Sequence, residues 1–337
     1  MGKAAAKRHA VETVTTNDAT SATVAAAKVR ARVTTLTANS YTSTAGTAAE
    51  VRATRTTLAA NGYRSTTGSA NSYTKGTAAA DEIRPPLKWA GGKRWLVPKL
   101  RELYAPYRNR RLVEPLCGGL AVALGLQPRR ALLNDISPHA SNFYRRLKAG
   151  FTIALEMRND ERLYYRYRER FNLLVAQGAA DSLEAAALFY FLNRTGYNGL
   201  CRFNSRGEFN VPFGRYTTIN YVRDFACYRG AFARWTFSSK DFAHLPLHPD
   251  DFVYADPPYD VVFTRYAKED FGWDDQVRLA GFLAAHRGPV VLSNQATERI
   301  VELYDRRGFA LSFMPAARRI SCKDRKPALE VLATRNL

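Results

Sequence analysis

Phe252-Val253-Tyr254-Ala255-Asp256-Pro257-Pro258-Tyr259 is the segment that most clearly indicates the class of fold. Its four apolar or aromatic residues predict a buried strand. The two prolines predict that the strand ends in a rigid turn, because proline fixes φ and donates no hydrogen bond. Comparable strands are expected at 111–114, 131–134, 289–292, 309–314 and 328–333. Helical sequence between the earlier strands predicts an α/β fold, with a mostly parallel sheet covered on both faces.

The turn after this strand presents two hydrogen-bond acceptors at the sheet edge where open α/β sheets bind ligands. They are the carboxylate of Asp256 and the carbonyl of Pro257. Two acceptors that take both N–H bonds of an amine localise its lone pair toward an incoming methyl group. Tyr259 is suited to stack on a base that has left a duplex. The alternative is an ordinary strand-to-turn junction, and on its own the turn indicates only a site for some planar amine.

A glycine-containing segment, Lys88-Trp89-Ala90-Gly91-Gly92-Lys93, begins the ordered part of the sequence. Its two glycines allow the backbone to approach a ligand closely, Trp89 offers a stacking face, and Lys93 adds a positive charge. The segment lacks the spacing of a phosphate-binding P-loop.

A second glycine turn follows the strand at 111–114, where the chain reads Val113-Glu114-Pro115-Leu116-Cys117-Gly118-Gly119. Asp135 ends the next strand, 17 positions after Gly118. This spacing is typical of nucleoside sites, in which the acidic residue binds the ribose hydroxyls. The complete G-x-G-x-x-G pattern is absent, which disfavours a dinucleotide and leaves S-adenosylmethionine open. The alternative is a plain βαβ turn with Asp135 as a helix cap.

The composition favours a polyanionic partner. The net charge is +20 and the pI is near 10, and neutralised phosphates would release counterions. The four cysteines show no C-x-x-C pair, which argues against a zinc site and a disulfide framework. The longest apolar run, 185–192, is too short for a bilayer, and no secretory signal is present. We therefore expect a soluble, cytoplasmic protein with no metal and no membrane partner.

Residues 1–84 differ from the rest of the chain. They are rich in Ala, Thr, Ser and Asn, and Val29-Arg30-Ala31 returns 22 positions later as Val51-Arg52-Ala53. The repeats hold too few large apolar residues to pack on one another. The favoured interpretation is a disordered basic repeat tail. An arm that orders on nucleic acid and an organellar transit peptide are the alternatives.

Residues 150–240 interrupt the α/β alternation with helical, aromatic and arginine-rich sequence, and we interpret them as an inserted domain. The catalytic domain would then comprise 85–149 and 241–337. Within the insert, 192–216 reads as a β-hairpin with its turn near Ser205-Arg206-Gly207. Its aromatic and arginine side chains are of the kind that enter a DNA groove. A solvated basic hairpin is the alternative.

The order of these segments resembles the Dam-type (class alpha) adenine-N6 DNA methyltransferases, over about residues 85–337. The resemblance implies a Rossmann-like S-adenosylmethionine-dependent methyltransferase sheet with an inserted helical target-recognition domain that carries the hairpin. It implies site-specific transfer of a methyl group to adenine N6 in double-stranded DNA after base flipping. It is also consistent with a GA-containing target site such as GATC, with a monomer, and with a cognate restriction endonuclease as a partner.

The resemblance also assigns roles to residues. Catalysis falls to Asp256, Pro257 and Tyr259, and cofactor binding to Trp89, Lys93, Gly118, Asp135 and Asp256. DNA contacts fall to Tyr197 and Asn198 near the extruded base, Leu200 and Arg202 at base edges, and Arg215 at a phosphate. One departure concerns cofactor affinity, because Leu120 fills the position of the family's second glycine. The alternatives are a methyltransferase for RNA adenine or a protein amide, and a non-catalytic DNA-binding relative.

Overall fold

The structure is a computed structural model that describes residues 83–222, 224–260, 271–316 and 328–337. The chain divides into two units, Met1–Ala78 and Ala79–Leu337, and the second contains every described residue. All but the last two residues of the predicted tail lie outside the described residues. In the described parts, no helix is long and apolar enough to cross a membrane.

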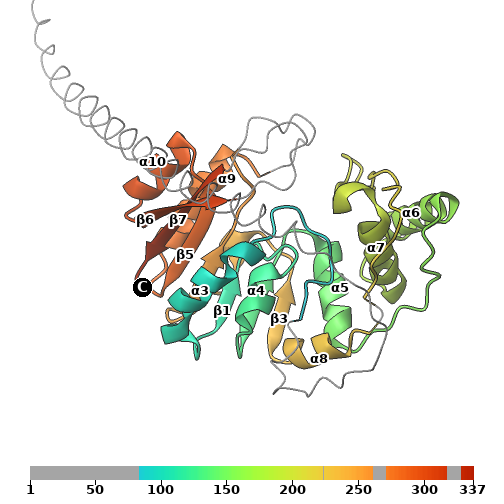
Figure 1. Ribbon diagram of the computed structural model, residues 1–337, viewed down its shortest axis with the longest axis horizontal. Helices are drawn as coiled ribbons and strands as arrows, with labels where there is room; N and C mark the ends of the chain where they lie inside the picture. The colour runs from blue at the N-terminus through green and yellow to red at the C-terminus, as the bar shows by residue number, and fades with distance from the viewer. Residues whose placement is uncertain (1–82, 223, 261–270, 317–327) are drawn as a thin grey trace, which may run out of the picture. The chain divides into compact units, whose positions relative to one another are not determined.

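A sheet in the order β3-β2-β1-β4-β5-β7-β6 forms the centre of the second unit (Figure 1). Strands β3, β2, β1, β4 and β5 are parallel, whereas β7 is antiparallel to both β5 and β6. Their bounds are β1 Leu112–Glu114, β2 Ala131–Asn134, β3 Trp235–Ser238, β4 Phe252–Ala255, β5 Val290–Gln295, β6 Ala310–Ala316 and β7 Ala328–Arg335. The predicted mixed α/β sheet, parallel apart from its closing pair, is confirmed.

Helices cover both faces of the sheet, which explains why its central strands are mostly apolar. Leu112 of β1 packs in one core, and the next residue, Val113, packs in the other, because side chains alternate along a strand. The first face carries α3 Val97–Tyr104, α4 Ala121–Leu126 and α5 Pro138–Lys148. The opposite face carries α9 Trp273–Ala284 and α10 Glu298–Arg306.

The region predicted as an insert contains two long helices, α6 Glu161–Ala176 and α7 Leu183–Thr195, which pack against each other. It also contains α8 Ala226–Phe232 and strand β3. Strand β3 pairs with β2, so its four residues belong to the sheet and not to an insert that ends at residue 240. Its residues, Trp235-Thr236-Phe237-Ser238, continue the aromatic sequence before them, so no boundary was visible in the sequence. The division into catalytic and recognition domains stays a prediction.

The predicted hairpin is a short pairing in which Phe203 and Phe209 form an antiparallel bridge. Its turn is closed by Asn204, whose backbone N–H donates to the Glu208 carbonyl at 2.9 Å. Gly207 has a φ of 76°, which glycine adopts without strain. The amide of Phe209 donates to Asn172 Oδ1 of α6 at 2.8 Å, which attaches the hairpin to that helix.

Candidate active site

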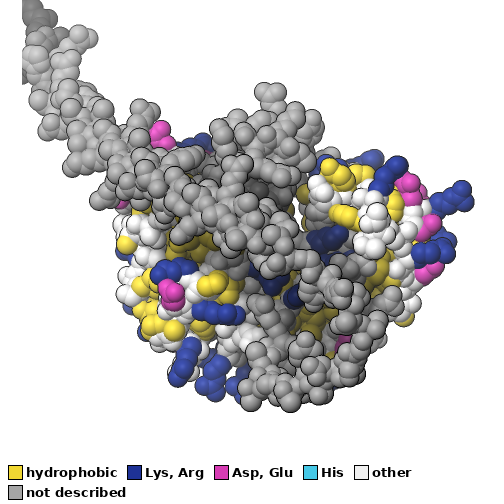
Figure 2. Space-filling model, in the orientation of Figure 1, with side chains coloured by type: hydrophobic (Ala, Val, Ile, Leu, Met, Phe, Trp, Pro, Cys, Tyr) yellow, Lys and Arg dark blue, Asp and Glu magenta, His cyan; other side chains and the backbone are white. Residues whose placement is uncertain are grey.

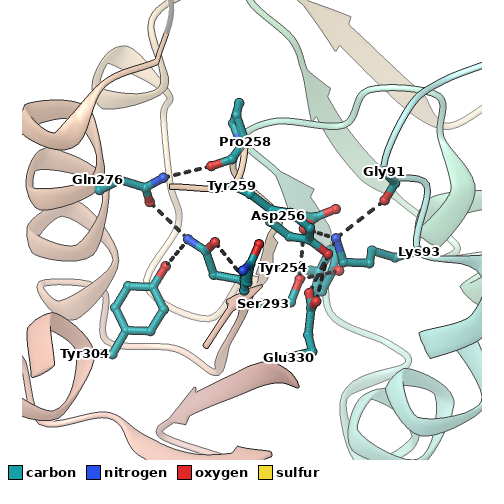
Figure 3. A network of polar contacts seen from close by, with 12 residues as sticks. Gly91, Lys93, Tyr254, Asp256, Pro258, Tyr259, Gln276, Ser293, Tyr304 and Glu330 are labelled. Carbon is teal, nitrogen blue, oxygen red and sulfur yellow. Dashed lines mark hydrogen bonds and ion pairs between the residues drawn. The ribbon is translucent and has the colours of Figure 1, made fainter. Parts of the chain in front are cut away.

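Asp256 lies directly after β4, with its side chain 19% exposed, so that a ligand can reach it. Two side chains from other parts of the chain hold its Oδ1 atom (Figure 3). Lys93 Nζ donates to Oδ1 at 2.6 Å, and Ser293 Oγ at the end of β5 donates at 3.1 Å. Both contacts use the same oxygen, which leaves Oδ2 turned away from the residues drawn in Figure 3.

Lys93 also approaches a carboxylate on β7. Its Nζ atom lies 3.5 Å from Glu330 Oε1 and 4.7 Å from the centre of the Tyr259 ring. The Tyr259 hydroxyl donates to Glu330 Oε2 at 2.7 Å. Burial acts to lower the pKa of Lys93, but the carboxylates of Asp256 and Glu330 outweigh burial and raise it. The ammonium is therefore charged in the protein interior.

Burial governs the carboxyl groups of this cluster. It raises the pKa of Asp256 and of Glu330, and in both cases Lys93 opposes the increase. Glu114, at the end of β1, has its pKa raised well above the ordinary value by burial and then by the charge of Asp256. Its Oε1 atom has no hydrogen-bond partner among the residues that the structure describes. Burial without a cation beside it favours the neutral form of this acid.

The backbone after Asp256 is fixed by a second set of side chains. Gln276 of α9 donates from Nε2 to the Pro258 carbonyl at 2.8 Å. Asn294 in turn donates to Gln276 Oε1 at 3.2 Å and to the Tyr304 hydroxyl at 3.0 Å (Figure 3). The turn that carries the two predicted acceptors is therefore held by strand β5 and helices α9 and α10, in addition to its prolines.

Asp135 connects the two strand ends at the glycine turn. Its Oδ2 atom accepts from the Gly118 amide, and its Oδ1 atom accepts from the Ser137 amide, each at 2.9 Å. Burial raises the pKa of Asp135, and these two amides oppose the increase. The contact to Ser137 is the local turn that the helix-cap alternative requires. The contact to Gly118 holds the carboxylate against the glycine turn after β1.

Trp89 packs directly on the glycine turn. A Cβ atom on Gly118 would lie 2.6 Å from Trp89 Nε1, and one on Gly119 would lie 2.6 Å from Trp89 Cβ. Neither glycine can therefore carry a side chain while the indole keeps its place. An aromatic face, a glycine turn and a buried carboxylate next to one another suit the adenosine part of S-adenosylmethionine, and the acidic cluster suits its positive sulfonium.

The residues predicted to contact DNA lie together on another part of the chain, after α7. Tyr197 and Asn198 are exposed in the short helix η3 Tyr197–Gly199, and Leu200 is half-buried. Arg202 is exposed and donates from Nε to Asn210 Oδ1 at 2.8 Å. Arg215 is 78% exposed and lies 3.3 Å from Glu161. Within its described residues, the structure records no contact between these side chains and the carboxyl groups of Asp256, Glu330 and Glu114.

Lys88 joins the two groups of residues. Asn193 of α7, which is fully buried, accepts from the Lys88 amide and donates to the Lys88 carbonyl, each at 2.8 Å. The Lys88 ammonium donates to the Arg194 carbonyl at 2.9 Å and lies 3.7 Å from the centre of the Tyr216 ring. Burial, aided by Arg194, lowers its pKa to about 8. The segment that carries Trp89 and Lys93 is thus attached to the end of α7, directly before the residues predicted to contact DNA.

Sequence reasoning assigned no role to Glu330, Glu114 or Asn193. One signal for Glu330 was visible, because it is an acid within the otherwise apolar strand Ala328-Leu329-Glu330-Val331-Leu332-Ala333. Acidic residues are almost never fully buried unless they are paired. The identity of its partners depends on contacts between distant segments, which the sequence pattern does not contain.

The sheet order, the glycine turn after β1 and the acidic turn after β4 define a methyltransferase that uses S-adenosylmethionine. A family model described as D12 class N6 adenine-specific DNA methyltransferase matches residues 89–319. The chain belongs to this family. It is an enzyme that transfers a methyl group from S-adenosylmethionine to adenine N6 in DNA.

Several known proteins are similar to the chain. It is 35% identical over 263 residues to the retron Ec67 DNA adenine methylase of Escherichia coli, covering 73% of this chain and 90% of the relative. It is 36% identical over 263 residues to the DNA N-6-adenine-methyltransferase of Escherichia phage P1, covering 73% of this chain but only 34% of that longer protein. A magnesium protoporphyrin IX methyltransferase from Synechocystis, solved with bound cofactor, aligns with a TM-score of 0.30 at 14% identity, covering 72% of this chain and 80% of that one.

Proposed function

We propose that the chain methylates adenine N6 at a specific sequence in double-stranded DNA, and that Asp256 receives the base after it leaves the helix. The observation that carries this proposal is the position of Asp256, whose Oδ1 atom is held by Lys93 and Ser293. A carboxylate fixed through one oxygen presents the other in a constant direction. Oδ2 is thus a preorganised acceptor for one N–H bond of the amine.

S-adenosylmethionine supplies an electrophilic methyl group. Asp256 Oδ2 and the Pro257 carbonyl accept the two N–H bonds of the target amine, which localises its lone pair toward that methyl group. Lys93 favours the charged form of the Asp256 carboxylate, because its ammonium lies beside Oδ1. Oδ2 is also placed to take the proton that N6 loses. The protein mainly contributes the positions of the acceptors.

Tyr259 is proposed to stack on the extruded adenine. Its ring lies over the Lys93 ammonium, and its hydroxyl is tied to Glu330. These two contacts fix the plane of the ring before a base arrives, and a fixed aromatic face is what a flipped base requires. Pro257, buried directly after Asp256, keeps the carbonyl and the ring on one rigid turn.

The cofactor is proposed to lie along Trp89, Gly118 and Asp135, with Lys93 and Asp256 at its methyl end. The close approach of Trp89 to Gly118 gives a flat wall, and Asp135 stands at the strand end where nucleoside hydroxyls are bound. Leu120 does not block this arrangement, because it adopts the left-handed conformation that a glycine would adopt there.

The exposed residues after α7 are proposed to contact DNA, with Tyr197 and Asn198 near the extruded base, Leu200 and Arg202 at base edges and Arg215 at a phosphate. Arg215 would exchange its ion pair with Glu161, and exposed pairs of this kind contribute little to stability. We propose a monomer, which light scattering of the free and DNA-bound protein tests. GATC stays the predicted target.

The proposal is tested by the variant Asp256→Ala. We expect methyl transfer to fall by at least about a thousandfold, because the oriented acceptor is lost. S-adenosylmethionine binding should remain measurable, because Trp89, Gly118 and Asp135 are unchanged. Incorporation of tritiated methyl groups into duplex DNA measures the first, and calorimetric titration the second. Wild-type transfer by this variant would contradict the mechanism.

The same assay separates the possible methyl acceptors. We expect duplex DNA to be labelled, and RNA or protein of equal concentration to remain unlabelled. Stronger labelling of RNA or of a protein amide would contradict the proposed substrate. Mapping of modified adenines in DNA from a methylation-free host that expresses the chain then gives the target sequence.

A further inference from the structure

Glu330 is a buried acid, and among the described residues its carboxylate contacts two side chains, both in the proposed site. It lies on β7, is 0% exposed, and is followed by the buried apolar residues Val331, Leu332 and Ala333. Its Oε2 atom accepts from the Tyr259 hydroxyl, and its Oε1 atom faces the Lys93 ammonium. Burying a carboxylate is energetically unfavourable. Its presence within an apolar strand therefore raises the question of what it does in the site.

The charges around Glu330 do not balance. Among the described residues, Lys93 is the cation that acts on the pKa of both Asp256 and Glu330, so that two carboxyl groups share one ammonium. Asp256 holds the shorter contact to Lys93, at 2.6 Å compared with 3.5 Å for Glu330. Burial raises the pKa of Glu114 well above its ordinary value, which favours the uncharged form of this neighbouring acid. With Asp256 and Glu330 ionised, the cluster carries one excess negative charge in a poorly solvated place.

We propose that Glu330 provides the negative charge by which this site selects the cationic cofactor over the spent one. The inference rests on the proposed cofactor position beside Lys93 and Asp256. S-adenosylmethionine and S-adenosylhomocysteine differ by one methyl group and by the positive charge on sulfur. During transfer the S–CH3 bond breaks and its electron pair stays on sulfur, while the N6 lone pair forms the N–CH3 bond and N6 passes a proton to Asp256 Oδ2. The attraction of Glu330 therefore disappears in the step that creates the product, which favours product release.

The variant Glu330→Gln separates this role from the positioning of Tyr259. Glutamine retains a carbonyl oxygen that accepts from the Tyr259 hydroxyl, but it removes the charge. We expect S-adenosylmethionine binding to weaken on the order of tenfold, as for a unit charge several ångströms away in a protein interior. The affinity for S-adenosylhomocysteine should stay within about twofold, because its sulfur is neutral. Both are measured by calorimetric titration of the full chain.

Three further variants control the experiment. Glu330→Asp retains the charge and should keep most of the preference for the cationic cofactor. Tyr259→Phe removes the hydrogen bond and should leave the ratio of the two affinities unchanged. Asp251→Asn neutralises a buried acid at the start of β4, where it pairs with Arg111, and should also leave the ratio unchanged. Thermal unfolding of each variant confirms that it is folded.

The outcomes are distinguishable. A selective loss of S-adenosylmethionine affinity in Glu330→Gln supports the proposal. Equal losses for both ligands would indicate a purely structural role and overturn it, as would unchanged affinities. If Trp89→Ala and Asp135→Ala leave binding of both ligands intact, the proposed cofactor position itself is wrong, whatever Glu330→Gln shows.

Discussion

Leu120 has a backbone conformation that glycine usually supplies. Its φ of 64° and ψ of 24° are left-handed, at the residue that precedes α4. This conformation costs a leucine about 1–2 kcal/mol. The side chain is 0% exposed in the core, and such burial contributes about 1.5–3 kcal/mol. The larger burial term explains how a leucine is tolerated where the family has a glycine.

Substitutions at Leu120 should reverse the usual order of alanine and glycine. Leu120→Ala loses the buried side chain and retains the strain, so we expect a destabilisation of about 3 kcal/mol. Leu120→Gly loses the same side chain but relieves the strain, and it should be about 1 kcal/mol more stable than Leu120→Ala. Urea unfolding measures both.

Leu124 is the matched control, because it is also a buried leucine but lies within α4, where the backbone is helical. There glycine should be less stable than alanine by about 1 kcal/mol. The same order at both positions would contradict the strain at Leu120.

At the scale of the elements, His139 packs α5 against the hairpin that contains Phe203 and Phe209. Its ring stacks on Phe203 with centroids 4.8 Å apart, and it meets Phe171 of α6 edge-on at 5.0 Å. The side chain is 7% exposed, and its Nδ1 atom has no partner within the described part of the chain. Burial lowers the pKa of His139 to about 4, so the folded protein holds a neutral imidazole.

This histidine should make the fold sensitive to mild acid. Its folded pKa of about 4 lies below the ordinary 6.5, so the unfolded chain binds the extra proton first. The stability that neutral His139 contributes is present above pH 6.5 and is lost as pH falls toward 4. We expect a loss of about 2 kcal/mol between pH 7.5 and pH 5.

Comparison with His139→Phe isolates this contribution. Phenylalanine retains the stacking on Phe203 but cannot be protonated, so its free energy of unfolding should fall less between the two pH values. The measurement is urea unfolding of both proteins at pH 7.5 and pH 5. If the free energy of unfolding falls equally in the two proteins, His139 is not the source of the sensitivity to acid.

The elements were predictable where their signals are local. The strand at 131–134 matches β2, and the strand before Asp256 matches β4 to within one residue, because each is a short apolar run between turn residues. The edge strand β3 was not predicted. Unlike β2 and β4 it is not a continuous apolar run, because Thr236 and Ser238 alternate with aromatic residues, and the strand is identified by its pairing with β2.

For the whole molecule, the net charge of +20 predicts DNA binding that is sensitive to salt. Each neutralised phosphate releases counterions, so contact with about four phosphates would lower the affinity by roughly a hundredfold between 50 and 200 mM salt. Fluorescence anisotropy of labelled duplex DNA measures this dependence. An affinity that is independent of salt would contradict the proposed phosphate contacts.

Arg215→Ala assigns one of those contacts. It should weaken binding to all sequences alike and reduce the salt dependence by about one phosphate. Arg306→Ala is the control, because Arg306 pairs with Glu302 on α10, away from the predicted hairpin. It should leave the salt dependence unchanged. If Arg215→Ala instead weakens binding to some DNA sequences more than to others, Arg215 contacts a base.

Some parts of this protein are encoded by residues that are adjacent in the chain, so they can be predicted from the sequence. Strand β4 with its Asp-Pro-Pro-Tyr turn, the glycine turn before Asp135 and the hairpin near Gly207 all follow from local backbone preferences. The oxygen of Asp256 that Lys93 holds is known only from the folded chain, because the two residues lie 163 positions apart. Likewise, only the folded chain shows that Glu330 meets Tyr259, across 71 positions. The physical reason is that a buried charge takes its state from its neighbours in space, which only the folded chain brings together.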